Sequence, residues 1–467
     1  MANEKTAGEL LSEKLLSKPK NVAEAIDEKE MEKVFEFSEG YKKFINSGKT
    51  EYDVVDYTVE YIESLGYKAY EFGKKYNAGD KVYLNNRGKS LIMSTIGSLP
   101  LSEGVYIAAS HIDSPRLDLK PRPLYEDKDI AYLKTHYYGG IKKYQWTTIP
   151  LALHGVVYKA DGSVVKVCIG DDKNDPVFCV TDLLPHLAAD QMSKNAMQII
   201  SGEQLNILVG SLPFKDDKAS EKVKLNIANI LFEKYGIVES DFISAELCAV
   251  PAFEARDIGF DRSMIGAYGH DDKVCAYPIL MAEVEAKNPK HTTVTVFADK
   301  EEVGSDGTTG MASMFYIDYI EDLAETQGVA LRHVLRNSKC LSSDVNAAVD
   351  PNFPDTHEKY NSAYINNGVV LTKYTGSRGK GGTNDATAET VAFFRNIFDK
   401  AGVIWQIGEL GKVDQGGGGT VAKYVSAHNI DTVDLGVPML SMHAPFEVVA
   451  KTDLYMTYKA IAAFYNY

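Results

Sequence analysis

Hydrophobic positions in the first quarter of the chain predict a helix followed by short strands. After Thr50, a candidate helix N-cap, Val55, Val59 and Ile62 recur with helical spacing, and Gly66 suits the end of that helix. Three β-rich runs follow, at 81–85, 91–96 and 105–110. The last run is almost wholly apolar and leads into a histidine, which is typical of a strand buried on both faces of a sheet.

The middle of the chain has a different pattern. Asp161-Gly162 separates two alternating runs, 153–159 and 163–169, as the turn of a β-hairpin would. From about residue 251, strand-like and helix-like segments alternate again, with strands predicted at 292–298, 340–343 and 432–438 and a helix at 390–398. This alternation predicts an α/β fold with a mixed, mostly parallel sheet flanked by helices. We therefore expect one discontinuous domain, 1–115 and 251–467, with an inserted β-rich domain at 116–250.

Composition and charge exclude several classes of protein. The chain has 467 residues, of which 45% are hydrophobic and 25% charged, so two or three globular domains are expected. Its net charge of −15 argues against a nucleic-acid partner and against an anionic membrane surface. No apolar run is long enough to span a bilayer, and the first twenty residues lack the apolar segment of a secretory signal. Five scattered cysteines without a CxxC pair favour reduced thiols and a cytoplasmic location.

Five short stretches contain residues that could bind a metal or act in catalysis. They contribute His111 and Asp113, Asp271 and Asp272, Glu301 and Glu302, Asp344, and His443. All except the aspartate pair directly follow a predicted strand, and the carboxyl ends of parallel strands meet at one edge of a sheet. The aspartate pair precedes an apolar run, 274–284, in which Pro278 requires that the helix either kinks or starts later.

Taken singly, each stretch is ordinary. A lone histidine or aspartate at a strand end is more often a structural hydrogen-bonding group, and the adjacent pair Glu301-Glu302 is normally a solvated acidic pair. Taken together, two histidines, two aspartates and a glutamate are the nitrogen and oxygen ligands of a two-cation site for zinc, cobalt or manganese. Asp113 lies two residues after His111, where a carboxylate can orient a metal-bound imidazole.

The order and neighbourhoods of these stretches resemble the aspartyl aminopeptidase/aminopeptidase I family of dinuclear zinc exopeptidases. The resemblance runs along most of the chain, through S-H-x-D-S-P at 110–115, P-H-L-A at 185–188, D-K-E-E-V-G-S at 299–305, S-S-D at 342–344 and S-M-H at 441–443. It implies two divalent ions per chain, with zinc the first candidate and cobalt or manganese the alternatives. By position, His111 and Asp344 would hold one ion, Glu302 and His443 the other, and Asp271 would bridge them.

The same resemblance implies roles for the neighbouring residues. Glu301 would be the general base, Asp113 the orienting carboxylate, and Lys373 a contact to the substrate side chain. For Asp272 we favour a helix N-cap or first-turn acid over a ligand role. His154 and six other histidines have no pattern of their own, and we interpret them as core or surface residues.

The implied activity is a metal-dependent aminopeptidase that removes acidic or neutral N-terminal residues from short peptides by metal-activated water. The resemblance also implies a homododecamer built from dimers through 116–250, which would serve as the dimerisation and lid domain. Two alternatives stay open. One is a dinuclear deacylase or carboxypeptidase on the same scaffold, and the other is a catalytically silent assembly or binding homologue.

The sequence departs from the family where substrate selectivity is concerned. Asp190 occupies a position at which family members with acidic specificity usually carry a histidine, and Asn346 and Asp350 also replace usual histidines. A carboxylate cannot help to bind an acidic side chain unless it is protonated or paired. A basic stretch at 373–382 offsets this loss in part, although it is equally consistent with an ordinary exposed loop. We therefore expect a specificity broader than strictly acidic.

Overall fold

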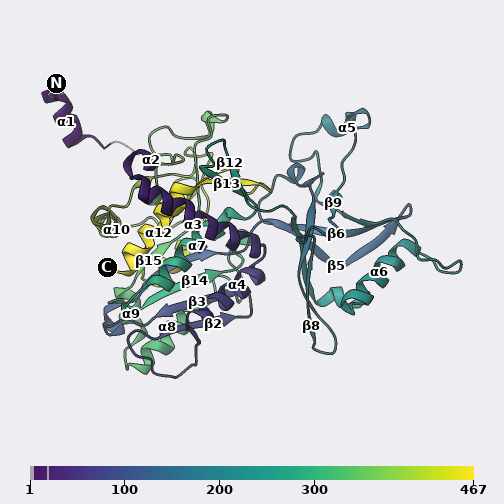
Figure 1. The fold of residues 1–467 in the computed structure, drawn as a ribbon, viewed down its shortest axis with the longest axis horizontal. Helices are drawn as coiled ribbons and strands as arrows, with labels where there is room; N and C mark the ends of the chain where they lie inside the picture. Colours follow the sequence, from purple (N-terminus) through teal and green to yellow (C-terminus); the bar gives the residue numbers. More distant parts are fainter. Residues whose placement is uncertain (1–4, 18–19) are drawn as a thin grey trace.

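A nine-stranded sheet forms the centre of the larger part of the molecule (Figure 1). The computed structural model describes residues 5–17 and 20–467. Neighbouring strands in this sheet are, in order, β1 (Lys68–Ala69), β2 (Lys81–Asn86), β3 (Ser90–Thr95), β14 (Thr293–Ala298), β4 (Tyr106–His111), β15 (Lys339–Ser342), β19 (Asp431–Gly436), β17 (Val369–Thr372) and β18 (Trp405–Ile407). The central run β14–β4–β15–β19 is parallel, whereas β2, β3 and β17 introduce antiparallel pairs. The predicted mixed, mostly parallel sheet is confirmed.

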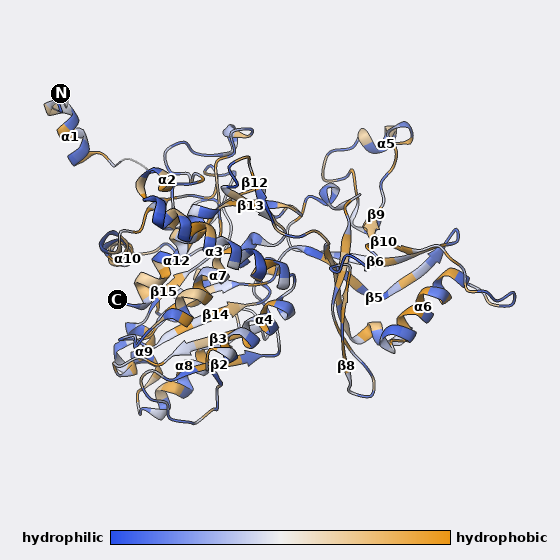
Figure 2. Ribbon diagram, viewed as in Figure 1, coloured by the Kyte–Doolittle hydropathy of each residue, from blue (hydrophilic) through white to orange (hydrophobic). Residues whose placement is uncertain are grey.

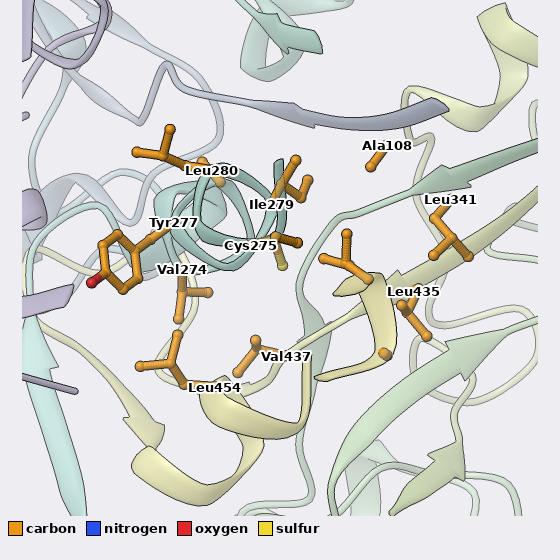
Figure 3. Close-up of a cluster of buried hydrophobic side chains, with 14 of the residues drawn as sticks. Ala108, Val274, Cys275, Tyr277, Ile279, Leu280, Leu341, Leu435, Val437 and Leu454 are labelled. Carbon is orange, nitrogen blue, oxygen red and sulfur yellow. The ribbon is translucent and has the colours of Figure 1, made fainter. Parts of the chain in front are cut away.

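Helices cover both faces of this sheet, so every residue of the central strands β4 and β14 is buried. On β4, Ala108 packs into one buried cluster and Ile107 into another. The first cluster includes residues of α3 (Glu28–Ser47), α4 (Glu51–Ser64), α7 (His270–Glu285), α10 (Ala388–Ala401) and α12 (Lys451–Tyr465). The second includes residues of α8 (Phe315–Thr326), α9 (Leu331–Asn337) and α11 (Ala422–Ser426). Figure 3 shows Ile279 and Cys275 on the side of α7 that faces the sheet residues Leu341 and Leu435, with Tyr277 on the opposite side of the helix.

The helix predicted after Thr50 is α4. The Thr50 hydroxyl caps it, and the Asp53 side chain returns the bond to the Thr50 N–H, forming a capping box. In α7, the backbone departs from helical angles at Asp271 and Asp272 and the helix then continues through Pro278. Pro278 was expected either to kink the helix or to delay its start. The non-helical backbone angles lie instead at the aspartate pair, before Pro278.

The strands between 116 and 251 form a separate, seven-stranded antiparallel sheet. Its order is β8 (Val164–Ile169), β7 (Leu151–Tyr158), β11 (Ala245–Pro251), β5 (Arg116–Asp127), β6 (Ile130–Tyr138), β10 (Ile207–Gly210) and β9 (Cys179–Val180). The predicted hairpin is β7–β8, which pairs in register from Tyr158↔Val164 to Leu153↔Ile169. This sheet has its own core around Trp146, and α6 (Lys222–Tyr235) lies beside it in the right-hand lobe of Figure 1. Hydrophobic and hydrophilic residues alternate along α6 (Figure 2).

A small third sheet corrects one sequence expectation. It comprises β12 (Arg256–Ile258), β13 (Met264–Ala267), β21 (Glu447–Ala450), β20 (Pro438–Leu440) and β16 (Asn346–Ala347). The single strand predicted at 432–438 is divided, because β19 ends at Gly436 and the chain then enters β20 of this third sheet. His443 therefore follows a strand of the five-stranded sheet rather than one of the nine-stranded sheet.

The remaining described helices are short or peripheral. They are α1 (Ala7–Leu15), α2 (Val22–Ala25) and α5 (Ala189–Met192), and α1 projects from the body without a buried residue. Among the described helices, none combines the length and apolar character needed to cross a membrane. All five cysteines are free thiols, as the sequence predicts.

Candidate metal centre

The predicted ligand residues converge into two clusters that share one carboxylate. The first cluster is His111, Asp271 and Asp344, and the second is Asp271, Glu302 and His443. Within each cluster, the potential ligand atoms lie within 4.8 Å of one another. His111 ends β4, Asp344 follows β15, and Glu302 lies in a short 3-10 turn after β14, so three adjacent parallel strands deliver them to one edge.

Asp271, at the start of α7, lies between the two imidazoles. Its Oδ1 is 3.1 Å from Nε2 of His111, and its Oδ2 is 3.2 Å from Nε2 of His443. Each carboxylate oxygen therefore faces a different histidine. This is the arrangement that allows one aspartate to bridge two cations.

Both imidazoles are oriented through their other nitrogen. Nδ1 of His111 lies 3.0 Å from the backbone oxygen of Asp113 and 3.3 Å from its Oδ1. Nδ1 of His443 lies 2.7 Å from the backbone oxygen of Gly140. A proton held on Nδ1 makes Nε2, the nitrogen that faces Asp271, the one that would coordinate a metal ion.

The Asp113 carboxylate organises the turn that carries the adjacent glutamates. It accepts hydrogen bonds from the backbone N–H groups of Glu301, at 3.1 Å, and Glu302, at 3.2 Å. The hydroxyl of Tyr138 donates to its Oδ2 at 2.8 Å. Asp113 is fully buried, so these donors compensate its charge.

Residues 138–140, which we call the Tyr138–Gly140 segment, contact Asp113 and a member of the second cluster. The segment begins at the last residue of β6, with the Tyr138 hydroxyl on Asp113 and the Gly140 carbonyl on His443. Gly139 has φ +75°, and a Cβ there would lie 3.1 Å from Oε2 of Glu302. Both the backbone conformation and the space therefore favour glycine at this position.

Burial controls the ionisation of the carboxylates. It raises the pKa of Glu301 to about 7 and holds the pKa values of Glu302 and Asp344 well above their usual range. Burial also opposes ionisation of Asp271, but hydrogen bonds with His111 and His443 outweigh it and lower the pKa of that carboxyl. Oε1 of Glu302 is buried, and no residue in 5–17 or 20–467 forms a hydrogen bond with it. A divalent cation would supply the missing positive charge, and the mixed imidazole and carboxylate donors fit zinc, cobalt or manganese.

Asp272 belongs to neither cluster. It lies in the first turn of α7, but the N-cap position is Gly269, and no described residue forms a hydrogen bond with either Asp272 oxygen. Of the two expected roles, the structure agrees with an acid in the first turn of the helix and not with an N-cap. Burial raises its pKa well above the usual range for an aspartate.

Within the described part of the chain, Lys373 pairs with Asp385 and with no member of the two clusters. It directly follows β17, and its Nζ donates to Oδ1 of Asp385 at 2.5 Å, while Lys380 donates to the other oxygen at 2.9 Å. Both lysines are partly exposed. The charge of the basic loop is therefore offset by a carboxylate of the same loop.

The residues that replace the family histidines have separate surroundings. Asp190 is exposed on α5, and Asp350 accepts a hydrogen bond from the backbone N–H of Asn352. Asn346 is buried and donates to the hydroxyl of Thr372 at 2.9 Å. Thr372 precedes Lys373, so along this strand the threonine, and not the lysine, faces Asn346.

Sequence reasoning missed three supports of the site. Glu447 accepts hydrogen bonds from the backbone N–H of His443, at 2.7 Å, and of Asp271, at 3.2 Å. Tyr138 and Gly140 were also unassigned. The Gly139-Gly140 pair was the only feature of the sequence that could have drawn attention to this segment. A hydrogen bond to a backbone carbonyl can be made by any residue type, so the sequence does not reveal it.

Comparison with known proteins identifies relatives along nearly the whole chain. The family model described as aminopeptidase I zinc metalloprotease (M18) matches residues 44–465. A Clostridium acetobutylicum protein named probable M18 family aminopeptidase 1 is 53% identical over 460 residues, covering 97% of this chain and 99% of that protein. The crystal structure of aminopeptidase I from C. acetobutylicum has a TM-score of 0.91 at 50% identity, covering 97% of this chain and 100% of that one. An M18 aminopeptidase structure from Thermotoga maritima has a TM-score of 0.92 at 43% identity, with coverages of 96% and 99%.

Proposed function

Because the chain belongs to the M18 family of zinc aminopeptidases, we propose that it removes N-terminal residues from short peptides with two divalent ions held at Asp271. The observation that carries this proposal is the Asp271 carboxylate, whose two oxygens face His111 and His443 at 3.1 and 3.2 Å. His111 and Asp344 would complete one ion site, and Glu302 and His443 the other. Zinc is the first candidate because the family is one of zinc metalloproteases.

When bound, such ions lower the pKa of a water towards neutrality and polarise the peptide carbonyl. The rest of the proposed reaction belongs to residues of this chain. Glu301 accepts the proton of the attacking water at its carboxylate and passes it to the nitrogen of the leaving amine. Its Oε2 lies 3.9 Å from Nε2 of His111, at the edge of the first cluster. Asp113 holds both the His111 imidazole and the Glu301 backbone in place.

We propose a specificity that includes neutral as well as acidic N-terminal residues. Lys373 is the candidate contact to an acidic side chain, but Asp385 already pairs with it and with Lys380. Asp190 and Asp350 add negative charge where the family usually has histidines. A tenfold preference needs only about 1.4 kcal/mol, so a partly compensated lysine can produce a bias without exclusivity.

Hydrolysis of a substrate panel tests the function. Aminoacyl chromogenic substrates with acidic and neutral residues are compared with N-blocked versions, before and after chelation. We expect turnover of both free-amino classes, no turnover of the blocked compounds, and loss of activity with chelator that added zinc, cobalt or manganese restores. Cleavage of blocked compounds would instead favour a deacylase, cleavage at a free C-terminus a carboxypeptidase, and no hydrolysis with metal loaded would favour a silent homologue.

We further propose that residues 116–250 form an inserted dimerisation and lid domain, with 1–115 and 251–467 forming the catalytic domain. The support is the separate seven-stranded sheet and its own core. The fold is shared with the S. cerevisiae mApe1 dodecamer, at 21% identity and a TM-score of 0.73, and we propose a homododecamer built from dimers here as well. The free cysteines suit a cytoplasmic location. Light scattering of the active fraction is expected to give about twelve times 51.5 kDa, and an active monomer would contradict this assembly.

A further inference from the structure

A second group of metal-ligating side chains lies where the seven-stranded sheet meets α4. His154 of β7, Cys168 of β8 and Asp171 just beyond β8 bring an imidazole, a thiol and a carboxylate within 4.8 Å of one another. We call these three residues the junction cluster. None of them belongs to the clusters around Asp271, and the proposed reaction uses none of them.

We propose that the junction cluster binds a divalent ion of the zinc or cobalt type through Nε2 of His154, Sγ of Cys168 and Oδ2 of Asp171. This site is separate from the catalytic centre. Its thiol ligand favours zinc or cobalt over manganese, magnesium or calcium, which prefer oxygen. Three protein ligands leave a fourth position for water.

The distances between the three atoms match those of a tetrahedral site. With zinc–ligand distances of about 2.0–2.1 Å for nitrogen or oxygen and about 2.3 Å for sulfur, tetrahedral angles place nitrogen and oxygen about 3.3 Å apart and sulfur about 3.5 Å from each. The structure has 3.0 Å between Nε2 and Oδ2, 3.9 Å between Sγ and Nε2, and 3.7 Å between Sγ and Oδ2. Shifts of about 0.4 Å or less would bring all three atoms to ideal separations.

The orientation of His154 is already that of a metal ligand. Its Nδ1 lies 3.0 Å from Oδ2 of Asp53, a carboxylate held in the capping box of α4 by the N–H and hydroxyl of Thr50. A proton held on Nδ1 leaves Nε2 facing Cys168 and Asp171. The same carboxylate–histidine arrangement orients His111 through Asp113 at the catalytic centre.

Lys49 binds the outer face of Asp171. Its Nζ donates to Oδ1 of Asp171 at 2.7 Å and to the carbonyl of Pro251 at 2.9 Å. This contact fixes the carboxylate so that Oδ2 remains directed at the imidazole and thiol. With a thiolate, two carboxylates, Lys49 and a neutral imidazole, the net charge is −2, which one divalent ion neutralises.

Accessibility differs among the three ligands in a way that allows loading from solvent. His154 is buried, with 3% of its surface exposed, whereas Cys168 is exposed and the Asp171 side chain is 29% exposed. An ion can therefore approach from the side of Cys168 and Asp171. On binding, the thiol proton and any proton on Nε2 leave to solvent, while the Nδ1–H of His154 still donates to Asp53.

Cobalt substitution of the full-length protein tests this site directly. A thiolate bound to cobalt gives a charge-transfer absorption in the near ultraviolet, and the clusters around Asp271 contain no sulfur ligand. We expect this absorption in the wild-type protein, its loss in Cys168→Ser, and its retention in the matched control Cys179→Ser. The result is independent of whether the proposed catalytic ions bind, because their ligands cannot produce the same band.

Metal counting and thiol labelling provide the second readout. After dialysis against zinc and removal of free ion, Cys168→Ser and Asp171→Asn should each contain one ion fewer per chain than the wild type and the control. Alkylation of Cys168, followed by peptide mass spectrometry, should slow at least tenfold when zinc is present. No sulfur-to-cobalt band, together with equal metal content in all four proteins and unprotected Cys168, would overturn the proposal.

Discussion

Glu301→Gln is expected to lower kcat by about 10²–10⁴-fold, or roughly 3–5.5 kcal/mol of transition-state stabilisation, while the bound metal is unchanged. Glutamine keeps the size of glutamate and can still hydrogen-bond a water, but it cannot accept a proton. Glu301 lies outside both ligand clusters, so its charge is not needed to hold an ion. Steady-state kinetics and elemental analysis of the same preparation measure both effects.

Glu302→Gln is the matched comparison because the two glutamates share their surroundings. Their backbone N–H groups bind opposite oxygens of Asp113, at 3.1 and 3.2 Å, so neither change alters the backbone support. Glu302 is a member of the second cluster, and its loss of charge should reduce metal occupancy at one site. If Glu301→Gln loses metal while Glu302→Gln retains it, the two roles are reversed. If neither variant slows hydrolysis more than a few-fold, the catalytic centre lies elsewhere.

Asp271→Asn should have the largest effect on metal content of any single substitution. Asp271 is the only residue common to both clusters, and asparagine removes the charge shared between them. We expect occupancy of both catalytic sites to fall and kcat/KM to drop by at least about 10³-fold, because the water is no longer activated. Isothermal titration calorimetry of the metal-free wild type and variant measures the change in affinity for the metal ions.

Asp272→Asn provides the neighbouring control. Asp272 is as buried as Asp271, but it belongs to neither cluster and its oxygens have no hydrogen-bond partner. Because burial raises the pKa of its carboxyl, a neutral asparagine is a close replacement. Metal content should therefore stay at the wild-type value. A greater loss of metal from Asp272→Asn than from Asp271→Asn would transfer the bridging role to Asp272.

The sequence predicted the parts of the fold whose residues repeat with a regular spacing. The buried run at 105–110 became β4, the Asp161-Gly162 turn joined β7 and β8, and the capped helix after Thr50 became α4. Each of these signals depends only on residues that are close in sequence, so it can be recognised without knowledge of the rest of the chain. His111, Glu302 and Asp344 came together as predicted, because the strands that carry them are parallel and their ends share one edge of the sheet. Asp271 and His443 reach the same place from the start of α7 and from the five-stranded sheet.

The contacts that the sequence did not reveal are the long-range ones. Nothing near Tyr138 or Gly140 indicates that they would reach Asp113 and His443. The path of the chain after Gly436 was also missed, because a pattern of alternation shows that a strand forms but not which sheet it joins. His154 was interpreted as a core or surface residue, since its partners Asp53 and Asp171 lie on other elements.

The Tyr138–Gly140 segment limits how freely this architecture can be rearranged. A domain that only covers an active site could be cut out, exchanged or lost in evolution without altering the reacting groups beneath it. Here, excision of 116–250 would remove the Tyr138 hydroxyl that donates to Asp113 and the Gly140 carbonyl that orients His443. The two parts of the protein are therefore not independent modules, and a minimal catalytic core cannot be engineered by deletion alone. Any transplanted replacement would have to reproduce a tyrosine hydroxyl and a backbone carbonyl at these two positions.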